Sequence, residues 1–160
     1  AMIYEGANGI QAMDLIGRKL PKDGGRAMMT FLTEVQTFIK DHGEDEAMKP
    51  FVAPLQPALN DLQGAVMWLM QNAFAKPDNA GAGATDLMHL LGTVVLGYMW
   101  GRIAKAALAR KAEGSDVERM DAKLVLGRFY MERMLPETSL RLARIKAGAE
   151  TTMALPAEAF

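Results

Sequence analysis

The chain has 160 residues, a formal net charge of −1 and no cysteine, and half of its residues are hydrophobic while only 7% are aromatic. This length is sufficient for one domain with a buried core. The near-zero charge argues against a dedicated nucleic-acid-binding protein, and the lack of cysteine excludes disulfides, a thiolate nucleophile and zinc–thiolate sites. The 13 methionines and abundant alanine favour helices over β-sheet.

A chemical signature stands at the beginning of the chain. Glu5 is followed by the small-residue turn Gly6-Ala7-Asn8-Gly9 and then by a helix-like run. A carboxylate just before a helix N-terminus lies near the positive end of the helix dipole, which favours its ionised form. Glycines let the backbone approach a ligand, and such a carboxylate can act as a general base. The same residues also fit a helix start without any catalytic role.

A short amphipathic helix is predicted over residues 7–18, where Asp14 and Arg18 are spaced for an i,i+4 ion pair. The linker Pro21–Gly25 follows, and its Asp23 is expected to cap the next helix.

Two further amphipathic helices are predicted next. Apolar residues at three- and four-residue spacing indicate a helix from about Arg26 to Asp41. We expect His42 and Gly43 to end it, the glycine in a left-handed turn. A third helix is predicted from about Pro57, because three prolines break its beginning: Pro50, Pro54 and Pro57.

The fourth helix, predicted over residues 85–112, is the least polar and is expected to lie centrally. The Ala/Gly-rich residues 80–84 before it are predicted to form a flexible connection. Its stretch without ionisable groups, residues 90–101, is too short to cross a bilayer, so no membrane span is expected. Its glycines would allow close approach of a neighbouring helix: Gly92, Gly97 and Gly101.

The last third of the chain predicts two helices and a tail. Ser115–Glu118 reads as a capping box for a fifth helix that kinks or breaks at Leu135-Pro136. A final helix is predicted to end near Ala147, with a Glu137–Arg141 ion pair. The predicted fold is therefore all-α, an up-and-down bundle of four long helices with a short N-terminal helix and a short C-terminal helix.

Two other sequence features have both a functional and a purely structural interpretation. Asp86 and His89 have the i,i+3 spacing of some metal sites, but the chain has no Glu-x-x-His motif, so no metal is expected. Residues 101–147 hold 11 Lys/Arg against 6 Asp/Glu. This excess fits a basic surface for an acidic partner, CoA phosphates included. It also fits basic and acidic helices that face each other across a bundle or simply face solvent, and this second interpretation is favoured.

Tyr4-Glu5-Gly6-Ala7-Asn8-Gly9-Ile10-Gln11 resembles the C-terminal signature of acyl-CoA dehydrogenases, usually Tyr-Glu-Gly-Thr-Asn-Gly-Ile-Gln. The resemblance implies that Glu5 is the catalytic base, which removes the α-proton of an acyl-CoA while the β-hydride passes to FAD. It also implies that Gly6 lies against the substrate and that Ala7, Asn8 and Gly9 approach the FAD. Ala7 replaces the usual Thr, so a hydroxyl contact to the cofactor is lost here.

The resemblance extends to the branch that includes 3-methylmercaptopropionyl-CoA dehydrogenase-like enzymes. It implies that residues 1–20 end the dehydrogenase helical domain, that residues 21–147 form an extra C-terminal bundle, and that residues 148–160 are a tail. It further implies an FAD-dependent cytoplasmic oxidoreductase of fatty acid metabolism. Expected partners are acyl-CoA, electron-transfer flavoprotein or a similar acceptor, and a second copy in a dimer.

Only four residues precede Glu5, whereas the family needs further domains before it, so we expect a C-terminal fragment that is inactive alone. The alternative hypothesis is a non-catalytic helical interaction or dimerisation module in which the Glu5 motif is accidental.

Overall fold

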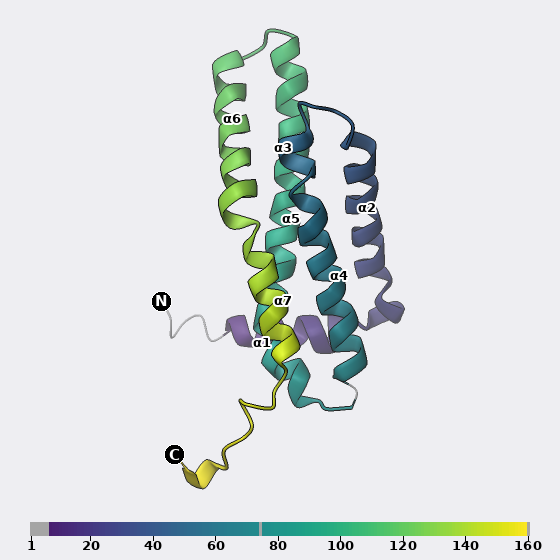
Figure 1. Cartoon of the computed structure of the whole chain (residues 1–160). Coiled ribbons are helices and arrows are strands. Elements are labelled where there is room, and N and C mark those ends of the chain that lie inside the picture. The colour runs from purple at the N-terminus through teal and green to yellow at the C-terminus, as the bar shows by residue number, and fades with distance from the viewer. Residues whose placement is uncertain (1–6, 74, 160) are drawn as a thin grey trace.

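The computed structural model describes residues 7–73 and 75–159, and every regular element in these ranges is helical. Four columns of helix run up, down, up and down, as Figure 1 shows. The first three columns are α2 (Arg26–His42), α4 (Leu55–Asn72) and α5 (Asp78–Ala112). The fourth column is built from α6 (Val117–Phe129), a π-helical turn (Tyr130–Met134) and α7 (Glu137–Ala147). The predicted all-α bundle is confirmed, with the short C-terminal helix placed within the fourth column.

Short elements connect and flank these columns. α1 (Ala7–Asp14) and the π-helical turn Leu15–Lys19 lie across the bundle against α5. A 3-10 turn (Lys22–Gly25) leads into α2, and α3 (Lys49–Val52) links α2 to α4. A second 3-10 turn, Ala157–Ala159, lies in the tail.

α5 is the central helix of the bundle. It packs against α1, α4, α6 and α7, while α2 packs mainly on α4. By length and composition α5 could cross a membrane. Its packing against four other helices is that of a core helix in a bundle.

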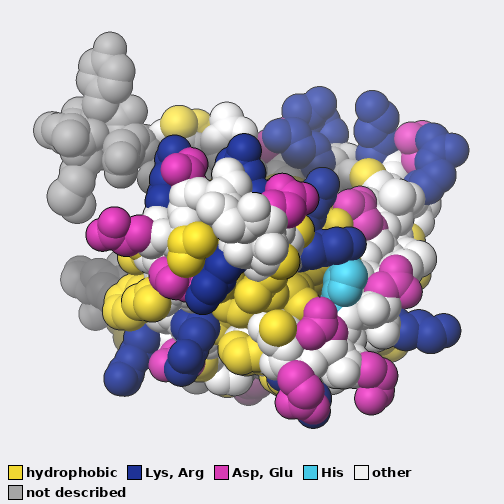
Figure 2. Space-filling view, turned by 90° about the horizontal axis from the view of Figure 1, so that it is seen from above, with side chains coloured by type: hydrophobic (Ala, Val, Ile, Leu, Met, Phe, Trp, Pro, Cys, Tyr) yellow, Lys and Arg dark blue, Asp and Glu magenta, His cyan; other side chains and the backbone are white. Residues whose placement is uncertain are grey.

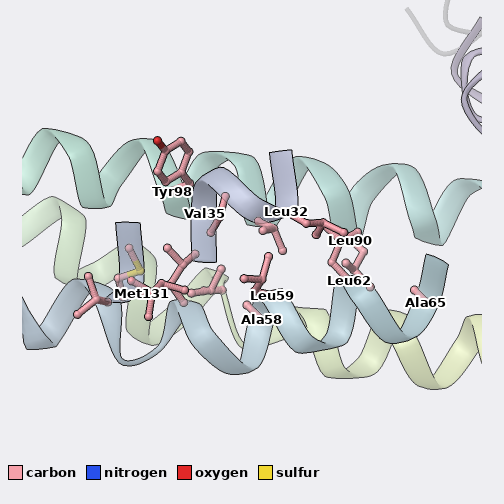
Figure 3. Packing of buried hydrophobic residues seen from close by; sticks show 14 of the residues in the cluster. Leu32, Val35, Ala58, Leu59, Leu62, Ala65, Leu90, Tyr98 and Met131 are labelled. Atoms are coloured by element: carbon pink, nitrogen blue, oxygen red, sulfur yellow. The ribbon is translucent and has the colours of Figure 1, made fainter. Parts of the chain in front are cut away.

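The core follows the predicted apolar stripes. In α2 and α4 the buried positions recur every three or four residues, and Figure 3 shows several of them meeting between the helices. They include Leu32 and Val35 of α2 and Leu59 and Leu62 of α4, which lie near Leu90 of α5 in the same core cluster. Three apolar residues of the fourth column are exposed to solvent: Val117, Met134 and Leu140.

The predicted flexible connection over residues 80–84 is wrong, because α5 begins at Asp78 and includes all five residues. Asp78 stands in the first turn, where its charge favours the helix dipole. A Cβ on Gly83 would lie 3.2 Å from Leu69 and 3.5 Å from Ile145. The small residues therefore permit close helix packing.

Three predicted helix ends differ in detail. Ser115 does not begin a capping box, because the residue that precedes α6 is Asp116 in a left-handed conformation, with φ 49° and no side-chain capping bond. Asp23 does not cap α2 but pairs with Arg26 at 3.2 Å. Gly43 follows α2 with φ −66°, so it makes no left-handed turn.

Two of the three glycines that were predicted to permit close packing on α5 do so. A Cβ on Gly97 or Gly101 would lie 2.9 Å from Leu135 or Phe38, respectively. Gly92 is different, because no atom lies within 4 Å of the equivalent position.

Candidate functional site

The predicted catalytic motif lies at the N-terminal edge of the described chain. Glu5 and Gly6, the predicted base and substrate contact, lie outside the described residues. Ala7, Asn8 and Gly9, the predicted cofactor contacts, form the first turn of α1 and are exposed to solvent.

α1 is held by one buried face. Ala12 is fully buried and faces the bundle, and Ile16 and Leu20 beyond it pack against the core cluster. Ile10 and Met13 lie on the outer side, 69% and 47% exposed. This arrangement fixes the first turn on the surface, beside an apolar face that is uncovered in this chain.

An ion-pair cluster forms at the C-terminal end of α1. Arg18 Nε and Nη2 donate to the two carboxylate oxygens of Asp14 at 2.5 and 2.9 Å, and Lys19 Nζ lies 3.3 Å away. The predicted Asp14–Arg18 pair is thus confirmed. The hydrogen bond from Arg18, more than any other contact, lowers the pKa of Asp14 from 3.8 to about 2.

The first turn of α1 is open to solvent around Gly9. A Cβ on Gly9 would meet no atom within 4 Å, and Ala7 presents only a methyl group. The described residues of the motif therefore fit the close approach of a cofactor such as FAD.

Asp86 has a different role from the metal ligand weighed from the sequence. It accepts a hydrogen bond from Arg141 Nη1 at 2.6 Å, and Arg141 Nη2 lies 2.5 Å from Glu137. The predicted Glu137–Arg141 pair is confirmed. Among residues 7–73 and 75–159, no three potential metal ligands gather in one place.

Sequence reasoning missed a groove between α2 and α5. Its volume is about 440 Å³, and it is lined by Glu34, Phe38, Tyr98, Arg102, Lys105, Ala106 and Ala109. Its signal in the sequence is slight. Tyr98, Arg102 and Lys105 recur at helical spacing on α5, so they lie on one face of an otherwise apolar helix.

Known proteins resemble this chain over most of its length. The family description "Acetyl-CoA dehydrogenase C-terminal like" matches residues 31–156. This chain belongs to that family.

Three curated proteins are similar to this acetyl-CoA dehydrogenase C-terminal-like chain. The 3-methylmercaptopropionyl-CoA dehydrogenase of Ruegeria pomeroyi is 32% identical over 144 residues, which cover 89% of this chain and 24% of that protein. The broad-specificity linear acyl-CoA dehydrogenase FadE5 of Mycobacterium tuberculosis is 27% identical over 143 residues, 84% of this chain and 23% of the relative. The butyryl-CoA dehydrogenase of Syntrophomonas wolfei is 26% identical over 166 residues, 99% of this chain and 26% of the relative.

This C-terminal-like chain spans about a quarter of the length of the curated relatives that it matches. The resemblance to acyl-CoA dehydrogenases that begins at Glu5 is therefore supported by residues far beyond that motif.

Proposed function

We propose that this chain is the C-terminal part of a longer, FAD-dependent acyl-CoA dehydrogenase that oxidises an acyl-CoA to the trans-2-enoyl-CoA. The observation that carries the proposal is the family match over residues 31–156, which lies downstream of the Tyr4–Gln11 motif. The names of the three relatives, all acyl-CoA dehydrogenases, support it.

In this proposal Glu5 is the catalytic base. Its carboxylate takes the α-proton of the thioester, and a carbon–carbon double bond forms as the β-hydrogen leaves with its electron pair. FAD, when bound in the complete enzyme, supplies the acceptor for that hydride. Gly6 lies against the substrate, and Ala7, Asn8 and Gly9 lie beside the cofactor. The first turn of α1 supports that placement, because its residues are exposed to solvent and no atom crowds Gly9.

The remaining assignments follow from the same proposal. Residues 1–20 end the dehydrogenase helical domain, residues 21–147 form an additional bundle, and residues 148–160 form a tail. The complete enzyme is a cytoplasmic dimer that passes electrons to electron-transfer flavoprotein or a similar acceptor. We expect the 160-residue chain alone to be inactive, because it spans only about a quarter of the length of the related dehydrogenases.

The test uses the complete protein from which this chain comes. We expect a yellow enzyme whose flavin bleaches on addition of one or more acyl-CoAs. Replacing Glu5 by Gln should lower turnover at least about 100-fold, because a positioned general base contributes that much or more. Flavin content should be unchanged in the variant.

The matched control is Glu44→Gln, which removes an exposed carboxylate from the turn after α2. Its turnover should equal that of the unmodified enzyme. A complete protein without flavin or response to acyl-CoAs would contradict the proposal and favour a helical interaction module. Full turnover in the Glu5→Gln variant would remove Glu5 from the mechanism.

A further inference from the structure

The groove between α2 and α5 lies between helices whose backbones stand apart. α2 packs mainly on α4, so side chains rather than backbone contacts fill the space toward α5. The Phe38 and Tyr98 rings meet edge to face with centroids 5.3 Å apart. α2 ends at His42, whereas α5 continues to Ala112. Figure 1 shows α5 and α6 extending past the end of α2.

One side of this groove is apolar. The aromatic rings of Phe38 and Tyr98 form its deep wall, and the small side chains of Ala106 and Ala109 line it farther along α5. Seen from the end where α5 extends past α2, apolar side chains lie open between basic and acidic ones (Figure 2). A ligand therefore meets both apolar surface and charge.

The other side of the groove carries cations without carboxylate partners. The Arg102 guanidinium lies 5.6 Å from the centroid of the Tyr98 ring. Among the residues that the structure describes, Arg102 and Lys105 form no ion pair. Lys111, six residues beyond Lys105 on α5, is already paired with Asp121 at 2.5 Å.

Glu34 is the one acidic residue that lines the groove, and it is already engaged. Its carboxylate accepts a hydrogen bond from the Tyr98 hydroxyl at 2.7 Å. The groove therefore presents two cations against one carboxylate. Both cations lie within residues 101–147, which carry 11 basic and 6 acidic side chains. A negatively charged ligand would be attracted and held here.

The open shape of the groove decides between classes of ligand. Small-molecule sites are concave and bury most of the surface of the ligand. This groove is open to solvent along its length and would cover one side only. A protein segment supplies its own cover, and a helix can lay apolar side chains into such a groove while its carboxylates reach the rim.

We propose that the α2–α5 groove is a docking site for an acidic amphipathic helix of another protein. Apolar side chains of that helix contact Phe38, Tyr98, Ala106 and Ala109, and its carboxylates pair with Arg102 and Lys105. The lining of the groove includes none of the described motif residues Ala7, Asn8 and Gly9, and the proposal does not depend on the dehydrogenase activity.

The test uses the 160-residue chain and a designed helical peptide that repeats Leu-Glu-Glu-Leu-Ala-Glu-Ala. We expect the peptide to shift the backbone NMR signals of the groove residues and to bind more weakly as salt is added. A second peptide with Gln in place of each Glu should bind at least about tenfold more weakly, which corresponds to about 1.4 kcal/mol.

Two variants of the groove test its residues. The double variant Arg102→Glu/Lys105→Glu should raise the Kd at least about tenfold. Arg119→Glu/Lys146→Glu changes the net charge equally at exposed cations that form no ion pair in the described chain, so its Kd should change little. Ala109→Trp fills the groove from an exposed position and should also block binding. Circular dichroism checks that each variant remains helical.

Three outcomes would overturn the proposal. Equal weakening by the two charge-reversal variants would mean that only general charge attracts the peptide. Shifts centred on another surface would place binding elsewhere. The same shifts with inorganic phosphate, at a similar affinity, would make the groove a small-anion site.

Discussion

Gly97 lies where α5 packs tightly against its neighbours. A Cβ there would lie 2.9 Å from Leu135 Cδ1 and 3.3 Å from Leu55 Cδ1, and both leucines are buried. Gly97→Ala should therefore lower the free energy of unfolding by about 1–3 kcal/mol, the usual cost of overpacking a core. Urea unfolding measures this change.

Gly92 is the matched control for this substitution, because it lies on the same helix and a Cβ there meets nothing within 4 Å. Gly92→Ala should raise the free energy of unfolding by about 0.5–1 kcal/mol, since alanine loses less conformational entropy than glycine in a helix. Equal effects of the two substitutions would contradict the packing assigned to Gly97.

A second prediction concerns the pKa of the Asp14 carboxyl group. Its folded-state pKa, about 2, is below the ordinary value of 3.8, so its contribution to stability is complete above pH 3.8 and is lost as the pH falls through about 2. NMR titration of the carboxyl carbon should give a midpoint near pH 2. In Arg18→Gln the midpoint should rise toward 3.8, because the hydrogen bond from Arg18 is the largest cause of the shift. A midpoint that stayed near 2 would mean that another group stabilises the carboxylate.

At the scale of the element, Arg141 joins α7 to α5. Its side chain is 19% exposed and that of its partner Asp86 is 18% exposed, so both are largely desolvated. Arg141→Met should lower the free energy of unfolding by about 2 kcal/mol, because Asp86 is left largely buried with only Arg144, at 3.8 Å. Thermal and urea unfolding both measure this loss.

Two further variants serve as controls for the Asp86–Arg141 ion pair. The double variant Asp86→Leu/Arg141→Met should recover much of the loss, since two apolar side chains leave no unpaired buried charge. Arg18→Met breaks an ion pair whose arginine is 74% exposed, and it should change stability little. A double variant as unstable as Arg141→Met would show that packing, not the unpaired carboxylate, causes the loss.

Most helices could be predicted from the sequence because periodicity reports which side of a helix is buried. Residues 80–84 could not, since Ala and Gly suit both a loose linker and a tight helix contact. What decides between them is the presence of Leu69 and Ile145 opposite Gly83, which is a tertiary fact. The capping box predicted at Ser115 is wrong for a similar reason. The conformation of Asp116, not the type of side chain, fixes where α6 begins.

At the scale of the whole molecule, the helix packing predicts which segments unfold locally first and which unfold only with the whole fold. α5 contacts α1, α4, α6 and α7, whereas the tail beyond Ala149 is exposed to solvent. Hydrogen exchange should be slowest near Leu87–Gly101 of α5 and fastest in residues 150–159, because buried, densely packed segments open only with the whole fold. Early exchange within Leu87–Gly101 would contradict a single core built around α5.

One functional feature could be predicted from the sequence, whereas another could be found only in the structure. The residues from Glu5 to Gly9 could be singled out because a short motif carries chemistry in its residue types. The α2–α5 groove could not be predicted. It exists because α2 ends at His42 while α5 extends past that point to Ala112. A groove of that kind depends on the relative lengths of two helices that are distant in sequence.

The π-helical turn Tyr130–Met134 has a consequence for how the fourth column tolerates change. Gly127, Met131 and Leu135 are all buried although they are separated by two successive steps of four residues. In a regular α-helix such steps drift around the axis, because one turn takes 3.6 residues. The wider turn absorbs the surplus residue and restores the phase for Thr138 and Ile145. A substitution in this turn alters one contact, whereas a one-residue deletion would rotate everything after it by about 100°. The register of α7 is thus encoded in chain length as well as in side chains.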